Sequence, residues 1–293
     1  MASPTYVLRM NRVMDHVRSH LDGDLSLETL GKVAHFSPYH FHRIFKATTG
    51  ETLVQFTQRA RLERAAYLMK ATPKRELGSI ALEVGFSAQS DFSRVFKRRY
   101  GIAPSTWDRK TRLDDTGLEN FDENVVAARA EGPEPVARVV DHPAIRLAYI
   151  RMKTPFVGDT LRRGYEQLTA WLEQRSVDWR SSTLLGLSWD NYETTPLDQV
   201  RFDFGFAVDD HIEADGDIGI HAFAPVRAAD VHCRGPLSRI AVAWDYLYNE
   251  WLPNSRFEPE DMPGIKRFRT RPDELGWDEW DVDCSIAVRP VQP

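Results

Sequence analysis

Apolar residues recur at helical spacing along the first third of the chain, in a block that occurs almost twice. The stretch FSPYHFHRIFKATTG at 36–50 returns as FSAQSDFSRVFKRRYG at 86–101. In the first copy Phe41, Ile44 and Phe45 fall at i, i+3 and i+4, which predicts a helix with one buried stripe. The apolar residues are the same or similar in the two copies, whereas many of the polar residues differ. The repeat therefore predicts one scaffold that presents two different outer surfaces.

A second short apolar stripe precedes each copy, in SLETLGKVA and in SIALEVG. Two short helices separated by three or four residues form a helix-turn-helix unit. Ser37 and Ser87 are the predicted N-caps of the second helices. His35 stands at the turn where the second unit has Gly85, and a positive φ there would suit glycine better than histidine.

A long helix is predicted between the two units. The segment TLVQFTQRARLERAAYLMK, residues 52–70, has its apolar side chains largely on one side. At 1.5 Å per residue this helix would be about 28 Å long, close to the roughly 34 Å between major-groove segments on one face of DNA. The spacing predicts two units seated in adjacent grooves.

These motifs resemble the DNA-binding domain of the AraC-type transcription regulators, over residues 8–112. The resemblance rests on LETLGKVAHFSPYHFHRIFKATTG and SIALEVGFSAQSDFSRVFKRRYGIAPSTW. It places base-reading side chains at Tyr39, His42 and Arg43 in the first unit and at Gln89, Ser90, Ser93 and Arg94 in the second. Arg can pair two-fold with guanine and Gln with adenine. Phosphate contacts are expected from Lys46, Lys97, Arg98 and Arg99. The alternative interpretation is that these residues form an ordinary charged helix surface exposed to solvent.

The second half of the chain alternates between strand and helix patterns, in an order that repeats. The predicted strands are 144–152, 183–190, 199–208, 230–235, 265–270 and 283–291, with helices at 158–175 and 236–253. This is a duplicated strand–helix–strand–strand unit, and it predicts an α+β fold with two helices on an antiparallel sheet. A groove between two similar halves is a natural small-molecule site.

This half resembles the GyrI-like effector-binding domain, over about 136–291. The resemblance rests on GLSWDNYETTPLDQVRFDFGFAV, on CRGPLSRIAVAWDYLYNEWLPNSRFEPEDMPGIKRF and on DCSIAVRPV. It implies a pocket for amphipathic or aromatic compounds that signals to the DNA-binding part. Candidate aromatic lining residues are Tyr165, Trp189, Phe206, Trp244, Tyr248 and Phe268.

One position departs from the GyrI-like pattern. The family commonly has a Glu two residues before an aromatic residue, and here Lys266 precedes Phe268. A carboxylate in an apolar pocket favours cations, whereas an ammonium favours an anion or a carbonyl oxygen. The substitution predicts an anionic or neutral effector, unless Lys266 points into solvent. Acids that could replace the missing Glu are Asp190, Glu193 and Asp203.

Charge divides the chain at the same place as the patterns do. Residues 1–112 hold 19 Lys and Arg against 10 Asp and Glu, and the remainder holds 19 against 33. We therefore expect a basic DNA-binding domain at 1–112, an acidic linker at 113–135 with a helical piece at 125–130, and a ligand-binding domain at 136–293.

Several classes are disfavoured by composition. No long apolar run predicts a membrane span, and the N-terminus has no secretory pattern. Two cysteines are too few for a disulfide framework, so Cys233 and Cys284 are expected to be small packed side chains in a reducing cytoplasm. His16 and His20 lack a third ligand at a motif spacing, so no metal and no cofactor are expected.

The sequence thus predicts a transcription regulator and not an enzyme. The regulator is expected to bind an asymmetric site on double-stranded DNA and to be controlled by a small effector. RNA polymerase is a further candidate partner, and no membrane is involved. Two alternatives stay open for the second half. It could hydrolyse a toxic small molecule, or it could be a protein-interaction module without a ligand.

Overall fold

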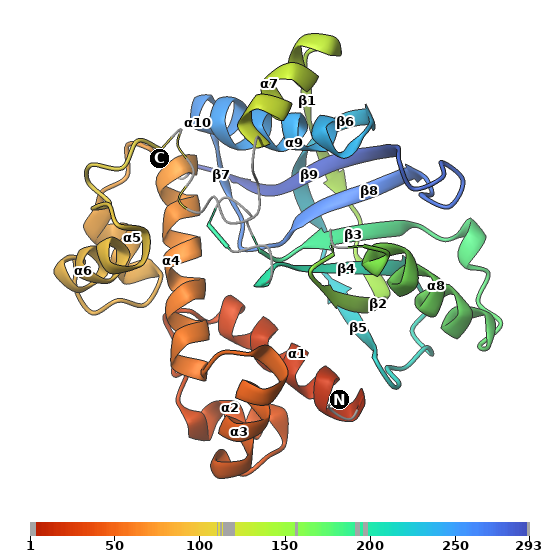
Figure 1. The fold of residues 1–293 in the computed structure, drawn as a ribbon, viewed down its shortest axis with the longest axis horizontal. Coiled ribbons are helices and arrows are strands. Elements are labelled where there is room, and N and C mark those ends of the chain that lie inside the picture. Colours follow the sequence, from red (N-terminus) through yellow and green to blue (C-terminus); the bar gives the residue numbers. More distant parts are fainter. Residues whose placement is uncertain are drawn as a thin grey trace. The chain divides into compact units, whose positions relative to one another are not determined.

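The computed structural model describes residues 4–109, 111, 113, 121–155, 158–190, 194–195 and 199–291 (Figure 1). The chain divides into two compact units. The first covers Met1–Leu113, and the second covers most of the remaining chain. Among the described residues, no core cluster includes residues of both units, so the two are described in turn.

The first unit is helical, as the apolar periodicity predicts. Its helices are α1 (Pro4–Ser19), α2 (Leu27–Ala34), α3 (Pro38–Thr49), α4 (Leu53–Ala71), α5 (Leu77–Glu83) and α6 (Gln89–Tyr100). The pairs α2–α3 and α5–α6 are the two helix-turn-helix units. Ser37 caps α3 by accepting a hydrogen bond from the backbone N–H of His40, and Gly50 and Gly101 end α3 and α6 in the left-handed conformation.

The start of α6 differs from the prediction. Ser87 is not the N-cap; the cap residue is Ala88, and no side chain caps the helix. The second copy has one more residue before its first core phenylalanine, and the structure places this residue in the turn. As a result Phe41 and Phe92 both occupy the fourth position of their helices. The outer positions of α3 and α6 therefore correspond one to one.

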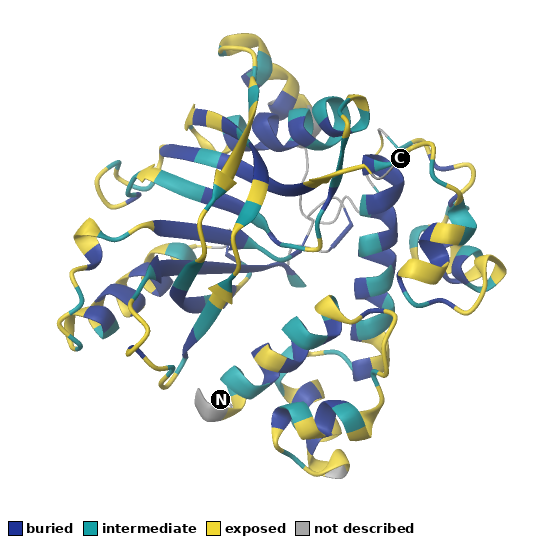
Figure 2. Ribbon diagram, turned by 180° about the vertical axis from the view of Figure 1, so that it is seen from behind, coloured by how far each residue is buried: buried dark blue, intermediate teal, exposed yellow. Residues whose placement is uncertain are grey.

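The long helix α4 is not one-sided, so that part of the prediction is wrong. Its buried side chains serve two cores, because it passes between the two helix-turn-helix units (Figure 2). Leu53, Phe56 and Ala60 pack with the core of α1–α3, whereas Leu62, Ala65, Ala66, Leu68 and Met69 pack with the core of α5–α6. A helix between two cores needs apolar residues on two sides, and one continuous helix thereby holds both helix-turn-helix units.

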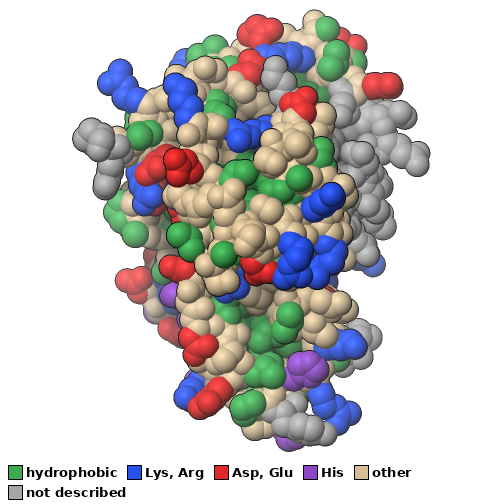
Figure 3. Space-filling view, turned by 90° about the vertical axis from the view of Figure 1, so that its left-hand side faces the viewer, with side chains coloured by type: hydrophobic (Ala, Val, Ile, Leu, Met, Phe, Trp, Pro, Cys, Tyr) green, Lys and Arg blue, Asp and Glu red, His purple; other side chains and the backbone are tan. Residues whose placement is uncertain are grey.

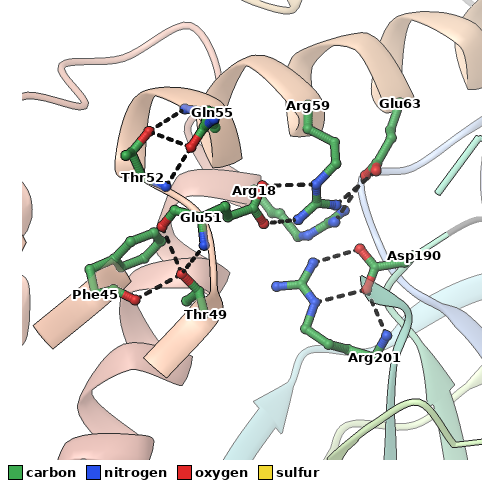
Figure 4. Close-up of polar contacts among 10 residues, drawn as sticks. All are labelled: Arg18, Phe45, Thr49, Glu51, Thr52, Gln55, Arg59, Glu63, Asp190 and Arg201. Carbon is green, nitrogen blue, oxygen red and sulfur yellow. Dashed lines mark hydrogen bonds and ion pairs between the residues drawn. The ribbon is translucent and has the colours of Figure 1, made fainter. Parts of the chain in front are cut away.

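Polar contacts fix the N-terminal half of α4 (Figure 4). Thr52 and Gln55 form a capping box at its start. Arg59 pairs with Glu51 and donates to Glu63 at 2.8 Å, and Arg18 of α1 donates to the same Glu63 at 3.1 Å. These ion pairs tie α1 and the turn before α4 to the connecting helix.

Both helix-turn-helix turns have a positive φ at the equivalent residue. His35 has φ 53° and Gly85 has φ 87°. The second turn is also crowded. A Cβ at Gly85 would lie 2.1 Å from the Leu21 carbonyl oxygen, which accepts a 2.9 Å hydrogen bond from Nε of Arg61. Only glycine fits this close approach.

The second unit is an antiparallel sheet with helices, which confirms the α+β prediction. The strands are β1 (Ala137–His142), β2 (Ile145–Lys153), β3 (Leu184–Ser188), β4 (Arg201–Ala207), β5 (Ile218–Phe223), β6 (Val226–Gly235), β7 (Phe257–Pro259), β8 (Gly264–Thr270) and β9 (Trp280–Pro290). Within the described residues the order is β1-β6-β9-β8-β3-β4-β2-β5, and β7 pairs with the free part of β9.

The strand order displays the duplication. One repeat is β2, helix α8 (Thr160–Glu173), β3 and β4, and the other is β6, helix α9 (Leu237–Asp245), β8 and β9. The repeats join where β3 pairs with β8. The strand that precedes each repeat pairs with the first strand of the other repeat: β1 pairs with β6, and β5 pairs with β2. Helix α8 packs on β2 and β4, and α9 packs on β6 and β9.

The predicted helical piece at 125–130 is part of a longer helix, α7 (Phe121–Glu131). It packs on α9 through Val125 and Ala128. Its Arg129 pairs with Glu250, in the π-helix (Tyr246–Trp251) that continues α9 into α10 (Leu252–Asn254). The second half of the acidic segment is thus attached to the second unit.

Candidate nucleic-acid interface and ligand site

The outer faces of α3 and α6 carry the residues predicted to read DNA. Their exposed members are His42, Arg43 and Lys46 on α3 and Gln89, Ser90, Arg94, Lys97, Arg98 and Arg99 on α6. Ser93 is half-buried, and the side chain of Tyr39 lies outside the described residues. Figure 3 shows the face of the molecule on which α5 and α6 lie, where Lys and Arg side chains stand among acidic and hydrophobic ones.

The cations on these two helices occupy equivalent places. Arg43 and Arg94 are each the sixth residue of their helix, and Lys46 and Lys97 are each the ninth. Arg94 forms an ion pair with Asp91, and their side chains are 67% and 39% exposed. An exposed pair of this kind contributes at most about 1 kcal/mol. Arg94 can therefore leave Asp91 for a base or a phosphate at little cost.

Lys266 lies on the face of the sheet that the helices cover. Its side chain is 3% exposed, and Nζ donates a 2.7 Å hydrogen bond to Oγ of Ser188. The same Nζ lies 5.0 Å from the ring centre of Phe202 and 5.5 Å from that of Trp244 on α9. The solvent-facing alternative for Lys266 is therefore excluded.

Burial sets the electrostatics of this lysine. Removal from water lowers the pKa of Lys266 to about 8. Within the described part of the chain it has a hydroxyl, two aromatic rings and two nearby thiols, but no ion pair. A buried ammonium without a carboxylate is unfavourable. The place therefore favours a ligand that brings a negative charge or a strong oxygen acceptor.

Aromatic rings surround the lysine because a glycine makes room for them. Gly186 is the direct partner of Lys266 across β3 and β8. A Cβ at Gly186 would lie 2.5 Å from Cζ of Phe202 and 3.3 Å from Cε2 of Phe268. Glycine at the centre of a sheet is unfavourable on propensity alone. Here it leaves room over the sheet for the rings of Phe202 and Phe268.

A second aromatic group under α8 continues from the first. Phe204 lies 5.7 Å from Phe268 and 5.6 Å from Tyr165, and Phe206 lies 5.7 Å from Tyr165. Tyr165 donates a 2.6 Å hydrogen bond to Asp273. Burial, with this contact, raises the pKa of Tyr165 well above its usual value. On the α9 side, Trp244 and Tyr248 stack at 5.7 Å. The structure thus connects most of the predicted lining residues.

Trp189 is separate from that group. It follows Ser188 and lies on the opposite face of the sheet, where its Nε1 donates to Asp203 at 2.6 Å. Asp203 is also held by two 2.8 Å hydrogen bonds from Arg151, and Asp190 is held by Arg201 (Figure 4). These two acids are engaged with arginines, so neither replaces the family Glu beside Lys266. Glu193 lies outside the described residues.

Three residues of the site were not foreseen from the sequence. Ser188 reaches Lys266 only through the β3–β8 register, which no local pattern reveals. Phe202 belongs to the alternating run of β4, but that run does not show which of its rings meets the lysine. Trp277 lies 5.3 Å from Tyr165 and has a φ of 72°, a conformation that non-glycine residues rarely adopt.

A pair of histidines lies on α1. The rings of His16 and His20 stack at 4.2 Å. Within the described ranges, no three His, Cys, Asp or Glu side chains gather in a way that could hold a metal ion. Nor is any described helix both long and apolar enough to cross a membrane.

Comparison with known proteins matches each unit to a family. A GyrI-like small molecule binding domain matches residues 137–289, and a helix-turn-helix domain matches residues 30–110. The bifunctional transcriptional activator/DNA repair enzyme AdaA of Bacillus subtilis is 32% identical over 104 residues, 36% of this chain and 49% of AdaA. The regulatory protein SoxS of Salmonella typhimurium is 30% identical over 95 residues, 32% of this chain and 88% of SoxS.

A solved structure also shows similarity to this chain. It is the EcmrR–DNA complex in EcmrR-RPo, with 14% identity and a TM-score of 0.42, and it covers 90% of this chain and 99% of that one. The chain spans about half the length, or less, of AdaA and of the Photobacterium leiognathi regulator LumQ.

Proposed function

We propose that a small effector in the second unit controls how the first unit binds an asymmetric DNA site. The chain belongs to the AraC family of helix-turn-helix transcription regulators and carries a GyrI-like small-molecule binding domain. The observation that carries the DNA part is the pair of matched cation positions on α3 and α6. The proposed location is the cytoplasm, where the bacterial chromosome lies. RNA polymerase is the candidate protein partner.

The two reading helices explain why the DNA site should be asymmetric. Their scaffolds correspond position by position, but several of their outer residues differ; for example, His42 on α3 has Ser93 on α6 as its equivalent. A connecting helix of about 28 Å suits consecutive major-groove segments about 34 Å apart. Each unit would then read its own short sequence, and one chain would cover two unlike segments.

Removing either matched arginine should relax sequence preference. We expect Arg43→Ala and Arg94→Ala each to weaken binding to the preferred site by about 1–3 kcal/mol, with little change on random DNA, since bidentate base contacts discriminate by this amount. Lys97→Ala should weaken both kinds of DNA alike and reduce the salt slope by about one. Fluorescence anisotropy at several salt concentrations measures both quantities.

The control variant is Arg162→Ala, which removes an exposed arginine of the second unit. It should leave both affinities unchanged. Equal losses on preferred and random DNA in Arg43→Ala and Arg94→Ala would show that these arginines bind phosphates only, and the assignment of base-reading roles would fail.

The effector part rests on Lys266, a buried ammonium among aromatic rings with no ion pair in the described structure. An aromatic anion satisfies both features, because its ring stacks on Trp244 or Phe268 while its charge meets Nζ. Binding without turnover is proposed, since Asp190 and Asp203 are both paired with arginines. Recovery of unchanged ligand after long incubation distinguishes a binder from a hydrolase.

Charge reversal at this lysine should reverse ligand preference. We expect aromatic carboxylates such as salicylate to raise the melting temperature of the full chain, because a ligand at 100 times its Kd stabilises the folded form by about 2.7 kcal/mol. Lys266→Met should lose this effect, and Lys266→Glu should instead respond to aromatic cations. Thermal melting against a panel sorted by charge measures it.

Lys32→Met is the matched control, because this lysine is exposed on α2. It should respond to the panel as the wild type does. If the wild type and Lys266→Met gain the same stability from anions, Lys266 is not in the effector site. If no compound on a broad panel stabilises any variant, a protein-interaction role for the second unit gains support.

A further inference from the structure

The only two cysteines of the chain are in contact with each other. Cys233 lies on β6 and Cys284 on the adjacent β9, and Cys284 is paired in register with Val231, two residues before Cys233. Both side chains point to the same face of the sheet. Their Sγ atoms are 3.7 Å apart, and the residues are 6% and 0% exposed. The two thiols are therefore in contact and buried from solvent.

Lys266 stands beside this pair. It is the direct register partner of Cys284 across β8 and β9, so its side chain leaves the sheet on the same face. Its ammonium is buried, and it has no ion pair among the described residues. Two thiols are neutral when protonated. The local cluster thus carries one uncompensated positive charge.

We propose that Cys233 and Cys284 bind one monovalent soft metal ion, Cu⁺ or Ag⁺, as a two-coordinate dithiolate whose charge Lys266 balances. Thiolate sulfur is the ligand type that selects such ions. On binding, two metal–sulfur bonds form, and each thiol releases its proton to water without any change of oxidation state. The dithiolate complex of a monovalent ion carries one negative charge, which cancels the ammonium.

The sulfur positions need little adjustment. With metal–sulfur bonds of about 2.3 Å, as in zinc thiolates, a linear unit needs sulfurs about 4.6 Å apart, and a bent unit needs less. The observed 3.7 Å can open by small rotations of two side chains. Zinc is disfavoured because a structural zinc site needs four ligands, and the described structure gathers no third His, Cys, Asp or Glu here.

Ligand charge provides the selectivity. A divalent soft ion such as Hg²⁺ gives a neutral dithiolate, which would leave Lys266 uncompensated in its buried position. The lysine should therefore favour monovalent ions over Hg²⁺. The metal site and the proposed effector site both use Lys266. The metal proposal can still be tested separately, because metal binding is measured directly and requires no effector and no DNA.

The test is a competition titration of the reduced, full-length chain with Ag⁺ and, separately, with Hg²⁺ in chloride-free buffer. We expect one Ag⁺ per chain, and an affinity that falls at least about a hundredfold in Cys233→Ser and in Cys284→Ser, because each removes one of two ligands. Lys266→Met should lower the Ag⁺ affinity at least about tenfold while changing the Hg²⁺ affinity less than about threefold.

Melting curves of each variant establish that it is folded, and Lys32→Met serves as the control for loss of a lysine elsewhere. Ag⁺ binding that survives both serine substitutions would overturn the site. Equal effects of Lys266→Met on Ag⁺ and Hg²⁺, or no effect on either, would overturn the charge balance and with it the preference for monovalent ions.

Discussion

Gly85→Ala is expected to destabilise the first unit by about 3 kcal/mol or more, through strain in the left-handed conformation and overpacking. The new Cβ would lie 2.1 Å from the backbone oxygen of Leu21 and 2.9 Å from the Arg61 guanidinium. A backbone atom cannot rotate away as a side-chain tip can. The turn, the end of α1 and the middle of α4 meet here, so both helix-turn-helix units should loosen together.

Gly101→Ala is the matched control for this change. Gly101 also has a positive φ, 76°, but an added Cβ would meet nothing within 4 Å. It should cost only the conformational strain, about 1 kcal/mol. Hydrogen–deuterium exchange of the full chain reads α1, α4 and α5 separately from the second unit. Equal losses in the two variants would mean that the contact with Leu21 is not a constraint.

Asp203→Ala is expected to destabilise the second unit by about 3–5 kcal/mol, the usual effect of breaking a buried ion pair. The carboxylate is fully buried and accepts hydrogen bonds from Arg151, Trp189 and His221. Alanine would remove this acceptor and leave the Arg151 guanidinium without its buried carboxylate. Urea unfolding measures the loss through tryptophan fluorescence, since every tryptophan except Trp107 lies in the second unit.

Acid should weaken the same contact. Burial by itself raises the pKa of Asp203, but the Arg151 and His221 contacts lower it by more, so the net pKa lies below the ordinary value. The stability that the carboxylate supplies is complete above the unfolded pKa of about 3.9 and is lost as pH falls through the lower folded value. The difference in unfolding free energy between wild type and Asp203→Asn should shrink below about pH 4.

Asp141→Ala is the control for Asp203. It breaks the exposed pair with Arg227, and exposed ion pairs contribute little to stability. A cost for Asp203→Ala as small as that of Asp141→Ala would contradict the structural role of the buried pair.

Local periodicity predicted most of the fold. The apolar stripes of α3 and α6 and the alternating Phe202, Phe204 and Phe206 of β4 were sufficient, because each has one strong period. The edge strands β1 and β5 were missed. The exposed Val139 and Val140 of β1 give no alternation, since this strand is fixed by its pairing with the other repeat.

The surroundings of Lys266 were less predictable than the fold. A lysine at position 266 was visible in the sequence, but its partner Ser188 depends on strand register, and its room depends on Gly186 lying opposite. Trp189 was grouped with the other aromatics because of composition, yet alternation after Ser188 places it on the opposite face. Contacts between distant strands decided the first outcome, and local side-chain alternation decided the second.

Selection of bound DNA from a random duplex pool, with the full-length chain, examines the paired reading helices themselves. We expect enrichment of two unlike motifs centred about 10 base pairs apart, with Arg43→Ala relaxing one motif and Arg94→Ala relaxing the other. Two different motifs would follow from two equivalent helices with different outer residues. Enrichment of no sequence, or of a single motif that neither substitution alters, would contradict DNA reading by α3 and α6.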